Sequence, residues 1–217
     1  MYSSFYAAAR GVIAQQQKLD VTANNLANIN NYGYKNKSVS FSNLMYYNMN
    51  NQYGQDTAMK AGTGVKVEMT NTDFTPEAYT ETDGAYDFAI GGKGFFRLVN
   101  PSSDAVTYTR NGHFSLSQQG NQFYLVNDAG NRVCDRNGNP VIVNNGTFSG
   151  EIGIYQFNIT DGMQSVGDNE FAPTAKNGTP FLVQDGKLIR HALETSGVDM
   201  AEEMTKVIES KRAYSYA

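Results

Sequence analysis

Three groups of residues in this sequence carry side chains that could do chemistry. Residues 91–94 read Gly-Gly-Lys-Gly, which is similar to a phosphate-binding loop. Such a loop needs Ser or Thr after the lysine and a helix after the loop. Here Phe95 and Phe96 follow, so the run leads into a strand. We therefore predict a tight turn that requires glycine, with Gly92 and Gly94 as its structural residues.

Cys134 and His113 form the second group, because a cysteine nucleophile needs a histidine base close to it in space. Cys134 lies in an Arg-Val-Cys-Asp strand pattern, where a buried cysteine is the commoner outcome. Neither His113 nor His191 has a second histidine or a cysteine at the spacing of metal ligands. An enzyme using Cys134 and His113 stays open as an alternative, and it predicts a thiol with a depressed pKa.

Asp83 and Asp87 form the third group, but they lie near a strand and need not face one another as general acid and base. We expect the Asp87 carboxylate to fix a turn by accepting hydrogen bonds from backbone amides. Gly33 and Gly112 are expected at turns as well. No catalytic constellation results, so we expect no enzyme, no metal and no cofactor.

The composition bounds the class of protein. The 217 residues are 40% hydrophobic and carry a net charge of −4, which suits a folded protein without a basic surface. Nucleic acid is therefore excluded as a partner. No apolar run is long enough to span a bilayer, and the first residues lack the order of a cleaved signal peptide. The single cysteine excludes an intramolecular disulfide.

The first element is a helix with the spacing of a helix that packs along another helix. Phe5, Val12, Leu19 and Leu26 recur every seven residues. Their burial is worth roughly 6–12 kcal/mol in total, which is available only when the helix is covered. Glutamine and asparagine in and around this stripe favour a tuned contact between molecules over an ordinary core. The residues that we expect to mediate self-assembly here are Phe5, Val12, Leu19, Asn24, Asn25, Leu26 and Asn28.

The last element repeats this pattern. Asp199 begins a helix in which apolar residues follow a four-then-three spacing, interrupted only by Lys211. An intramolecular core helix is the alternative for both ends of the chain. The residues that we expect to mediate self-assembly here are Met200, Met204, Val207, Ile208 and Tyr214.

Between the helices, short apolar runs are separated by turn signals such as Asn111-Gly112, which predicts an antiparallel meander. The fold class is therefore mainly β with terminal α-helices, an antiparallel β body bracketed by helices that pack as a coiled coil in the assembly. We expect an N-terminal axial helix over 1–33, an extended connector over 34–61, a β-rich body over 62–193 and a C-terminal helix over 194–217. We also expect that last helix to be truncated.

Several sequence blocks resemble those of bacterial flagellar rod and hook proteins, the axial subunits of the hook–basal body. Residues 23–28 (Ala-Asn-Asn-Leu-Ala-Asn) and 33–35 (Gly-Tyr-Lys) are similar to the N-terminal signature of that family. Residues 87–96 are similar to its strand-turn-strand, 108–112 (Tyr-Thr-Arg-Asn-Gly) to its hairpin, and 194–199 (Glu-Thr-Ser-Gly-Val-Asp) to the start of its last helix. The blocks run the length of the chain in the family's order. One departure is Glu77, which stands where the family usually has a turn glycine.

The resemblance implies a structural subunit of the flagellar rod that polymerises helically into the drive shaft transmitting torque from motor to hook. It implies export through the flagellar type III apparatus without a cleaved signal and assembly in the basal body. Its partners would be copies of itself, other rod and hook proteins, the export apparatus and surrounding bushing rings. The segment 34–61 favours rod over hook, and the motifs favour distal over proximal rod. Hook or proximal rod stays an alternative.

A β-rich ligand- or carbohydrate-binding module is an alternative from a different class. Tyrosines such as Tyr46, Tyr47 and Tyr53 could stack on sugars. A binding module predicts a monomer at every concentration, whereas assembly predicts filaments on concentration.

Overall fold

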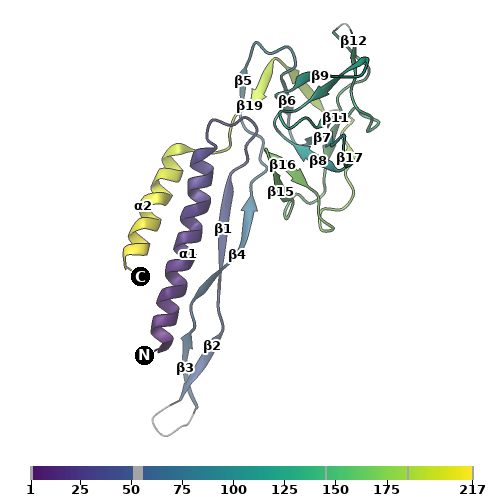
Figure 1. The fold of residues 1–217 in the computed structure, drawn as a ribbon. Helices are drawn as coiled ribbons and strands as arrows, with labels where there is room; N and C mark the ends of the chain where they lie inside the picture. Colours follow the sequence, from purple (N-terminus) through teal and green to yellow (C-terminus); the bar gives the residue numbers. More distant parts are fainter. Residues whose placement is uncertain (1, 51–55, 145, 185, 217) are drawn as a thin grey trace. The chain divides into compact units, whose positions relative to one another are not determined.

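The computed structural model describes residues 2–50, 56–144, 146–184 and 186–216 (Figure 1). The chain forms two compact units, each built from segments distant in sequence. The helical unit consists of Met1–Ala27, Lys37–Thr72 and Val198–Ala217. The sheet unit consists of Asn28–Asn36 and Asp73–Gly197.

Two helices of the helical unit run antiparallel and in contact, α1 (Tyr2–Ala27) and α2 (Met200–Tyr216) (Figure 1). Alanine, glutamine and leucine favour the helical state of α1. The helix ends at Ala27, and residues 30–33 (Asn-Asn-Tyr-Gly) follow it in a turn where Gly33 has φ 65°. The Asp199 carboxylate caps α2, since it accepts hydrogen bonds from the amides of Ala201 at 2.8 Å and Glu202 at 3.2 Å.

The helical unit also contains a ribbon of paired strands. These are β1 (Lys37–Asn43), β2 (Tyr46–Asn50), β3 (Asp56–Gly62) and β4 (Val65–Thr72). β1 pairs with β4 and β2 with β3, both antiparallel. The amide of Leu44 donates to the Gly64 carbonyl at 2.9 Å, which links the two pairs into one ribbon beside α1 (Figure 1). Most of the segment 34–61 that we expected as a connector thus lies in paired strands, while 51–55 fall outside the described residues.

The sheet unit is antiparallel throughout its described strand pairs. Within the described residues, nine strands form its largest sheet, in the order β15-β16-β8-β7-β11-β10-β9 with β14 and β17 attached beside β7. Smaller pairs join β6 to β18, β5 to β19 and β12 to β13. The bounds are β5 (Tyr79–Glu81), β6 (Phe88–Gly91), β7 (Phe95–Val99), β8 (Val106–Thr109), β9 (Ser115–Gln119), β10 (Gln122–Val126), β11 (Arg132–Val133), β12 (Val143–Asn144), β13 (Thr147–Phe148), β14 (Ile154–Gln156), β15 (Gln164–Gly167), β16 (Glu170–Ala172), β17 (Phe181–Leu182), β18 (Lys187–Arg190) and β19 (Ala192–Glu194).

Two apolar clusters form the core of the sheet unit, on the two faces of β7. Phe96 and Leu98 belong to one cluster and Phe95 to the other, because successive side chains of a strand point to opposite faces. The turn between β6 and β7 contains Gly92 and Gly94, both at positive φ. The strand-turn-strand that we predicted there is present, so the run is not a loop-to-helix phosphate site.

The predicted fold class is confirmed: an antiparallel β body lies between N- and C-terminal helices, and the helices contact each other. Over the described ranges, neither helix combines the length and the hydropathy that crossing a membrane would require.

Candidate assembly site

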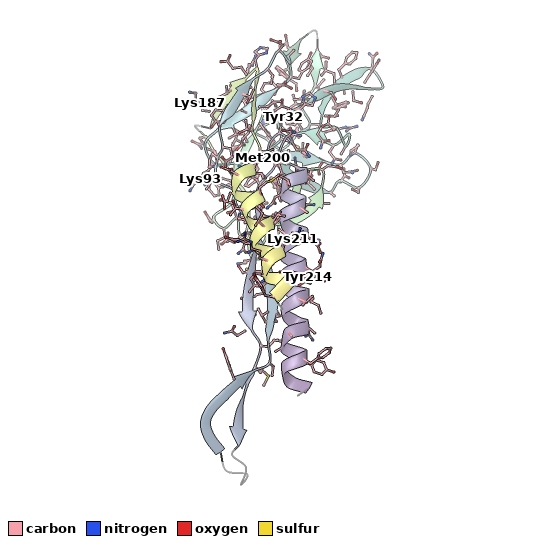
Figure 2. The ribbon with its side chains drawn as sticks, turned by 90° about the vertical axis from the view of Figure 1, so that its left-hand side faces the viewer. Tyr32, Lys93, Lys187, Met200, Lys211 and Tyr214 are labelled. Carbon is pink, nitrogen blue, oxygen red and sulfur yellow. The ribbon has the colours of Figure 1, made fainter. Side chains whose placement is uncertain are left out.

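The outward face of α2 is apolar. Met200, Met204, Ile208 and Tyr214 each expose 51–53% of their surface. Met200, Lys211 and Tyr214 follow one another along this helix in Figure 2. By contrast, the fully buried positions of α2 are Glu203 and Ser210. A helix whose packing is complete within one chain buries its apolar stripe. α2 instead exposes its apolar stripe together with polar residues such as Glu209 and Lys211, and it buries two polar residues.

The outward face of α1 is also rich in large apolar residues. Phe5 is 74% exposed, and Tyr6 and Ile13 are exposed as well. Val12, Leu19 and Leu26, the other residues of the predicted stripe, are half-buried. The stripe therefore lies along the border between the covered and the open side of the helix. Val207 of α2 is likewise half-buried.

The contact between the two helices is polar. The Asn25 amide donates to Glu203 Oε2 at 3.2 Å and to the Lys37 carbonyl at 2.7 Å, and Asn25 Oδ1 accepts from the Lys37 backbone amide at 3.1 Å. Asn25 thereby joins α1, α2 and the start of β1. Of the other asparagines in the predicted set, Asn24 is exposed and Asn28 is half-buried. A buried amide of this kind fixes the register of helices more than their affinity.

Glu203 also pairs with a lysine of its own helix. Lys206 Nζ lies 2.7 Å from Glu203 Oε1 and 2.8 Å from Glu202 Oε1. Partial burial by itself would lower the pKa of Lys206, but the hydrogen bonds that its ammonium donates to Glu202 and Glu203 outweigh burial and raise the pKa above 10.5.

A second buried polar cluster lies in the sheet unit, around Glu194. Its Oε1 lies 2.8 Å from Lys35 Nζ, and its Oε2 lies 2.7 Å from Arg110 Nε. Arg110 Nη1 donates to the carbonyls of Gly92 at 2.8 Å and Gly94 at 2.7 Å. The three charged side chains are at most 1% exposed, so this is an ion triad shielded from water.

The environment of the triad shifts the pKa values of two of its members. Burial by itself would raise the pKa of Glu194, but Arg110, and then Lys35, hold it below its ordinary value of 4.5. Burial lowers the pKa of Lys35, and the Glu194 charge offsets only part of this effect. The Lys35 ammonium also donates to the Thr75 carbonyl. The triad therefore links side chains and backbone from five separate stretches of the sheet unit.

The structure places Asp87 differently from our expectation. Its carboxylate accepts from the Thr82 hydroxyl at 2.6 Å and contacts His113 Nδ1 at 2.8 Å, so it binds side chains and not the backbone amides that we predicted. The backbone of Asp87 takes part in the turn, because its amide donates to the Gly84 carbonyl at 3.4 Å and its carbonyl accepts from His191. Sequence spacing could not show that strand pairing brings His113 opposite Asp87.

Two of the predicted turn glycines, Gly33 and Gly112, lie where backbone atoms of other segments come very close. A Cβ on Gly112 would stand 1.6 Å from the Phe88 carbonyl oxygen. One on Gly33 would stand 2.5 Å from the Asn111 nitrogen. Gly33 also donates its amide to the Glu194 carbonyl at 2.8 Å, so it belongs to the surroundings of the triad.

The thiol of Cys134 is not a nucleophile. The residue is fully buried, and burial raises the pKa of the thiol to about 11. The enzyme hypothesis required a depressed pKa and is therefore wrong.

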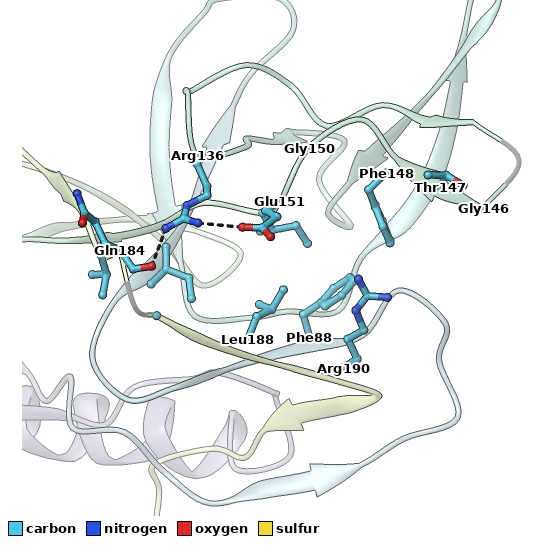
Figure 3. Close-up of a pocket in the computed structure, with 14 residues that line it drawn as sticks. Phe88, Arg136, Gly146, Thr147, Phe148, Gly150, Glu151, Gln184, Leu188 and Arg190 are labelled. Carbon is cyan, nitrogen blue, oxygen red and sulfur yellow. Dashed lines mark hydrogen bonds and ion pairs between the residues drawn. The ribbon is translucent and has the colours of Figure 1, made fainter.

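The sheet unit carries a cavity of about 640 Å³ that bears on the binding-module alternative (Figure 3). Phe88 and Leu188 line its apolar part, and Arg136 lies at its edge. Arg136 donates to Glu151 at 2.9 Å and to the Gln184 carbonyl at 2.6 Å, so its guanidinium is already engaged.

Of the tyrosines proposed for sugar stacking, Tyr46 is 57% exposed, while Tyr53 and the side chain of Tyr47 lie outside the described residues.

The sequence reading missed the roles of Lys35, Arg110 and Glu194, and that of Glu203. The signal was present, because each of the first three stands inside one of the motif blocks that carried the resemblance. Charged residues are rarely buried, so composition and periodicity place them at the surface. Their position within otherwise apolar or turn-forming motifs was the available clue.

Known protein families match three stretches of the chain. Residues 5–35 match the family described as "Flagella basal body rod protein". Residues 89–167 match "Flagellar hook protein FlgE/F/G D1 domain", and residues 189–216 match "Flagellar basal body rod FlgEFG protein C-terminal". The first and third stretches contain α1 and α2, and the second contains most of the large sheet.

Curated relatives match almost the whole chain. The flagellar basal-body rod protein FlgG of Buchnera aphidicola subsp. Schizaphis graminum is 32% identical, over 99% of this chain and 92% of the relative. FlgG of Caulobacter vibrioides is 31% identical, over 95% and 89% respectively. FlgF of Caulobacter vibrioides is 30% identical, over 99% and 90%. The chain therefore belongs to the flagellar basal-body rod protein family that includes FlgG and FlgF. It is a structural protein of that family and not an enzyme.

Proposed function

We propose that this chain is a distal-rod subunit that polymerises helically with copies of itself into the drive shaft between motor and hook. The terminal helices pack as coiled coils against helices of neighbouring copies, and the sheet units form the outer wall. Contacts between unlike surfaces of identical subunits generate an open helical filament. The relatives named FlgG, at 28–32% identity over most of the chain, support the distal position.

The observation that carries this proposal is that α2 exposes large apolar side chains while it buries polar ones. Its covered side holds Glu203 and Ser210, while Met204 and Ile208 face outward. Contiguous exposed apolar side chains mark a surface that binds another protein. Covering the open half of each large side chain is worth about 1 kcal/mol. The helices of a second copy of this chain carry the same exposed apolar residues and can cover this surface.

The proposal is tested by comparing two variants that each add one negative charge to the exposed surface of α2. Ile208→Asp lies in the apolar stripe, and Thr205→Asp is an exposed polar position of the same helix. We expect Ile208→Asp to raise the critical concentration for filament formation at least about tenfold, because 1.4 kcal/mol per contact corresponds to a factor of ten. Thr205→Asp should polymerise like the parent chain.

Circular dichroism of both variants controls for loss of the helices themselves. Equal critical concentrations for Ile208→Asp and the parent chain would count against assembly through this face. So would a parent chain that stays monomeric up to millimolar concentration in sedimentation experiments.

The position of the subunit along the flagellar rod and hook needs its own test. The relative named FlgF and the match to the hook-protein family support positions other than the distal rod. We expect an epitope tag on this chain to label the part of the isolated basal body next to the hook. Labelling near the membrane ring would favour a proximal-rod subunit, and labelling of the hook itself a hook subunit.

Assembly in that place requires partners besides the chain's own copies. We propose contacts with neighbouring rod and hook proteins and with surrounding bushing rings, and export through the flagellar type III apparatus without a cleaved signal. Secretion of the intact chain, with its N-terminal residues uncleaved and only when that apparatus is functional, tests the export route.

A further inference from the structure

The chain passes between the two units at four places in its sequence, after residues 27, 36, 72 and 197. The sheet-unit ends of these four passages are hydrogen-bonded to one another. The Asp73 amide donates to the Asn36 carbonyl at 2.9 Å, which joins the second and third passages. The Gly197 amide donates to the Tyr34 carbonyl at 2.9 Å, which joins the fourth to the same stretch. The Ser196 hydroxyl donates to the Asn28 carbonyl at 3.1 Å, which joins the fourth to the first.

Glu194 stands at the centre of this arrangement. Its backbone carbonyl accepts from Gly33, and its carboxylate accepts from Lys35 at 2.8 Å and from the Glu77 amide at 2.9 Å. Lys35 reaches on to the Thr75 carbonyl. One side chain therefore holds the chain shortly after the first passage, shortly after the third and shortly before the fourth.

Arg110 connects this arrangement to the large sheet. It binds the Glu194 carboxylate through Nε at 2.7 Å and Nη2 at 3.0 Å, a two-pronged pair. Its remaining Nη1 binds the Gly92 and Gly94 carbonyls in the turn before β7. β7 is flanked by β8 and β11 in the middle of the sheet. The passages are thus tied to the centre of the sheet and not to its edge.

We propose that Lys35, Arg110 and Glu194, which we call the junction triad, couple torque between the helical unit and the sheet unit. This inference rests on the proposed function, since it says how a rod subunit carries load. Torque on the helices reaches the sheet unit through the covalent chain at the four passages. The triad joins the chain segments beside these passages to one another. One segment therefore cannot separate from the sheet without the others, and all of them separate together.

The physical reason for ions at this place is the cost of separating them. Opening the triad without water leaves an uncompensated charge in a dry interior, which resists small displacements more strongly than apolar contacts do. Apolar side chains can slide past one another at nearly constant buried area, because that interaction is not directional. Bidentate and multidentate hydrogen bonds fix direction as well as distance.

The test compares two buried carboxylates of the sheet unit. Glu194→Gln alters the triad. Glu170→Gln alters a carboxylate that is 4% exposed and accepts from Thr107, Asn127 and Asn131, none of which belongs to the triad. In hydrogen exchange of the full chain, we expect Glu194→Gln to speed exchange of the Gly33, Glu77 and Gly197 amides together, by at least about tenfold. Glu170→Gln should leave these amides unchanged.

Filaments of the same variants give the mechanical readout. We expect Glu194→Gln filaments to form but to twist further under a given torque in magnetic tweezers, while Glu170→Gln filaments twist like the parent. If Glu194→Gln does not fold, Lys35→Met retains the Arg110–Glu194 pair and should show the same two changes in smaller degree.

The outcomes separate this inference from the proposed function. Exchange and torsional compliance of Glu194→Gln equal to those of Glu170→Gln would overturn the role of the triad and leave the rod assignment intact. Faster exchange spread evenly over the whole sheet unit would also overturn it, because the triad would then only stabilise the fold. Failure of the parent chain to polymerise would contradict the proposed function, while the exchange experiment would still decide whether the four passages yield together.

Discussion

At the scale of residues, the charge of Glu194 compensates two buried cations, Lys35 and Arg110. A carboxylate that is 1% exposed and faces both Lys35 and Arg110 leaves two buried cations without compensation when it is removed. Removing one partner of a buried ion pair typically costs about 3–5 kcal/mol. A pair at the surface has no such penalty.

We therefore expect Glu194→Gln to lower the free energy of unfolding by about 3–5 kcal/mol in denaturant titrations at pH 7. The matched control is Glu151→Gln, because Glu151 pairs with Arg136 in a bridge whose two side chains are 79% and 38% exposed. That variant should lose at most about 1 kcal/mol. Equal losses in the two variants would show that the buried triad is no stronger than a surface pair.

Glu194 also predicts a pH dependence. Its pKa lies below 4.5 in the folded chain, so its contribution to stability is fully present above about pH 4.5 and is lost as the pH falls through the folded value. The parent chain should consequently lose more stability between pH 5 and pH 3 than Glu194→Gln does. Lys35, Arg110 and the nearby Glu77 face the same carboxylate. Parallel pH profiles for the two proteins would contradict the lowered pKa.

Glycine at position 112 is required by close approach and not by backbone conformation. Gly112→Ala places a Cβ against the Phe88 carbonyl oxygen, so β6 or the turn must move. We expect a loss of about 1–3 kcal/mol or more in thermal unfolding. Gly11→Ala in α1 is the control, because a Cβ there meets nothing within 4 Å and alanine favours helix by up to about 1 kcal/mol. A neutral Gly112→Ala would show that the turn relaxes freely.

The sequence located the important residues better than it assigned their roles. Lys35, Arg110 and Glu194 fall in the motif blocks, but their pairing depends on strand order, which no local pattern contains. Glu77 is the reverse case. It stands where a turn glycine was expected, yet it does not adopt positive φ, and its amide binds Glu194. The position therefore needs an available amide and not a glycine.

At the scale of elements, periodicity predicted both helices. In α2 most of the predicted apolar residues are exposed, whereas in α1 only Phe5 of the predicted stripe is exposed and Val12, Leu19 and Leu26 are half-buried. Periodicity could not show which of these apolar residues are buried within the chain. A heptad pattern is the same whether the partner helix belongs to the same chain or to another molecule. The answer came from the contact between the helices, where Asn25 and Glu203 meet. The hairpin over 37–72 was harder to predict. In β1 and β4 apolar residues alternate with polar ones, but these strands bury little, and the alternation does not show which strands pair.

The helix contact yields a prediction of its own. Asn25→Ala removes a buried hydrogen bond to Glu203 and partly buried ones to both backbone groups of Lys37. We expect a loss of about 1–3 kcal/mol in unfolding free energy and faster proteolysis of α2. Gln17→Ala, at an exposed position of α1, should change neither. Normal protease resistance of Asn25→Ala would show that the apolar contacts alone hold the helices together.

At the scale of the whole molecule, the two units differ in how fully they bury their apolar side chains and pair their buried polar groups. The sheet unit has two closed apolar clusters and a satisfied ion triad. The helical unit buries polar groups, including a Ser210 hydroxyl without a hydrogen-bond partner among the described residues, and exposes apolar ones. A unit of this kind reaches its full stability only when other helices cover it. Membership of the rod family supplies the reason for such incompleteness.

The most direct test of this account is a cryo-EM reconstruction of the filament or basal body that contains this chain. We predict that Met204 and Ile208 of α2 and Phe5 of α1 lie buried against helices of neighbouring subunits, while Asn25 and Glu203 remain paired within each subunit. A rod in which these apolar side chains face water or the subunit's own sheet would contradict the account.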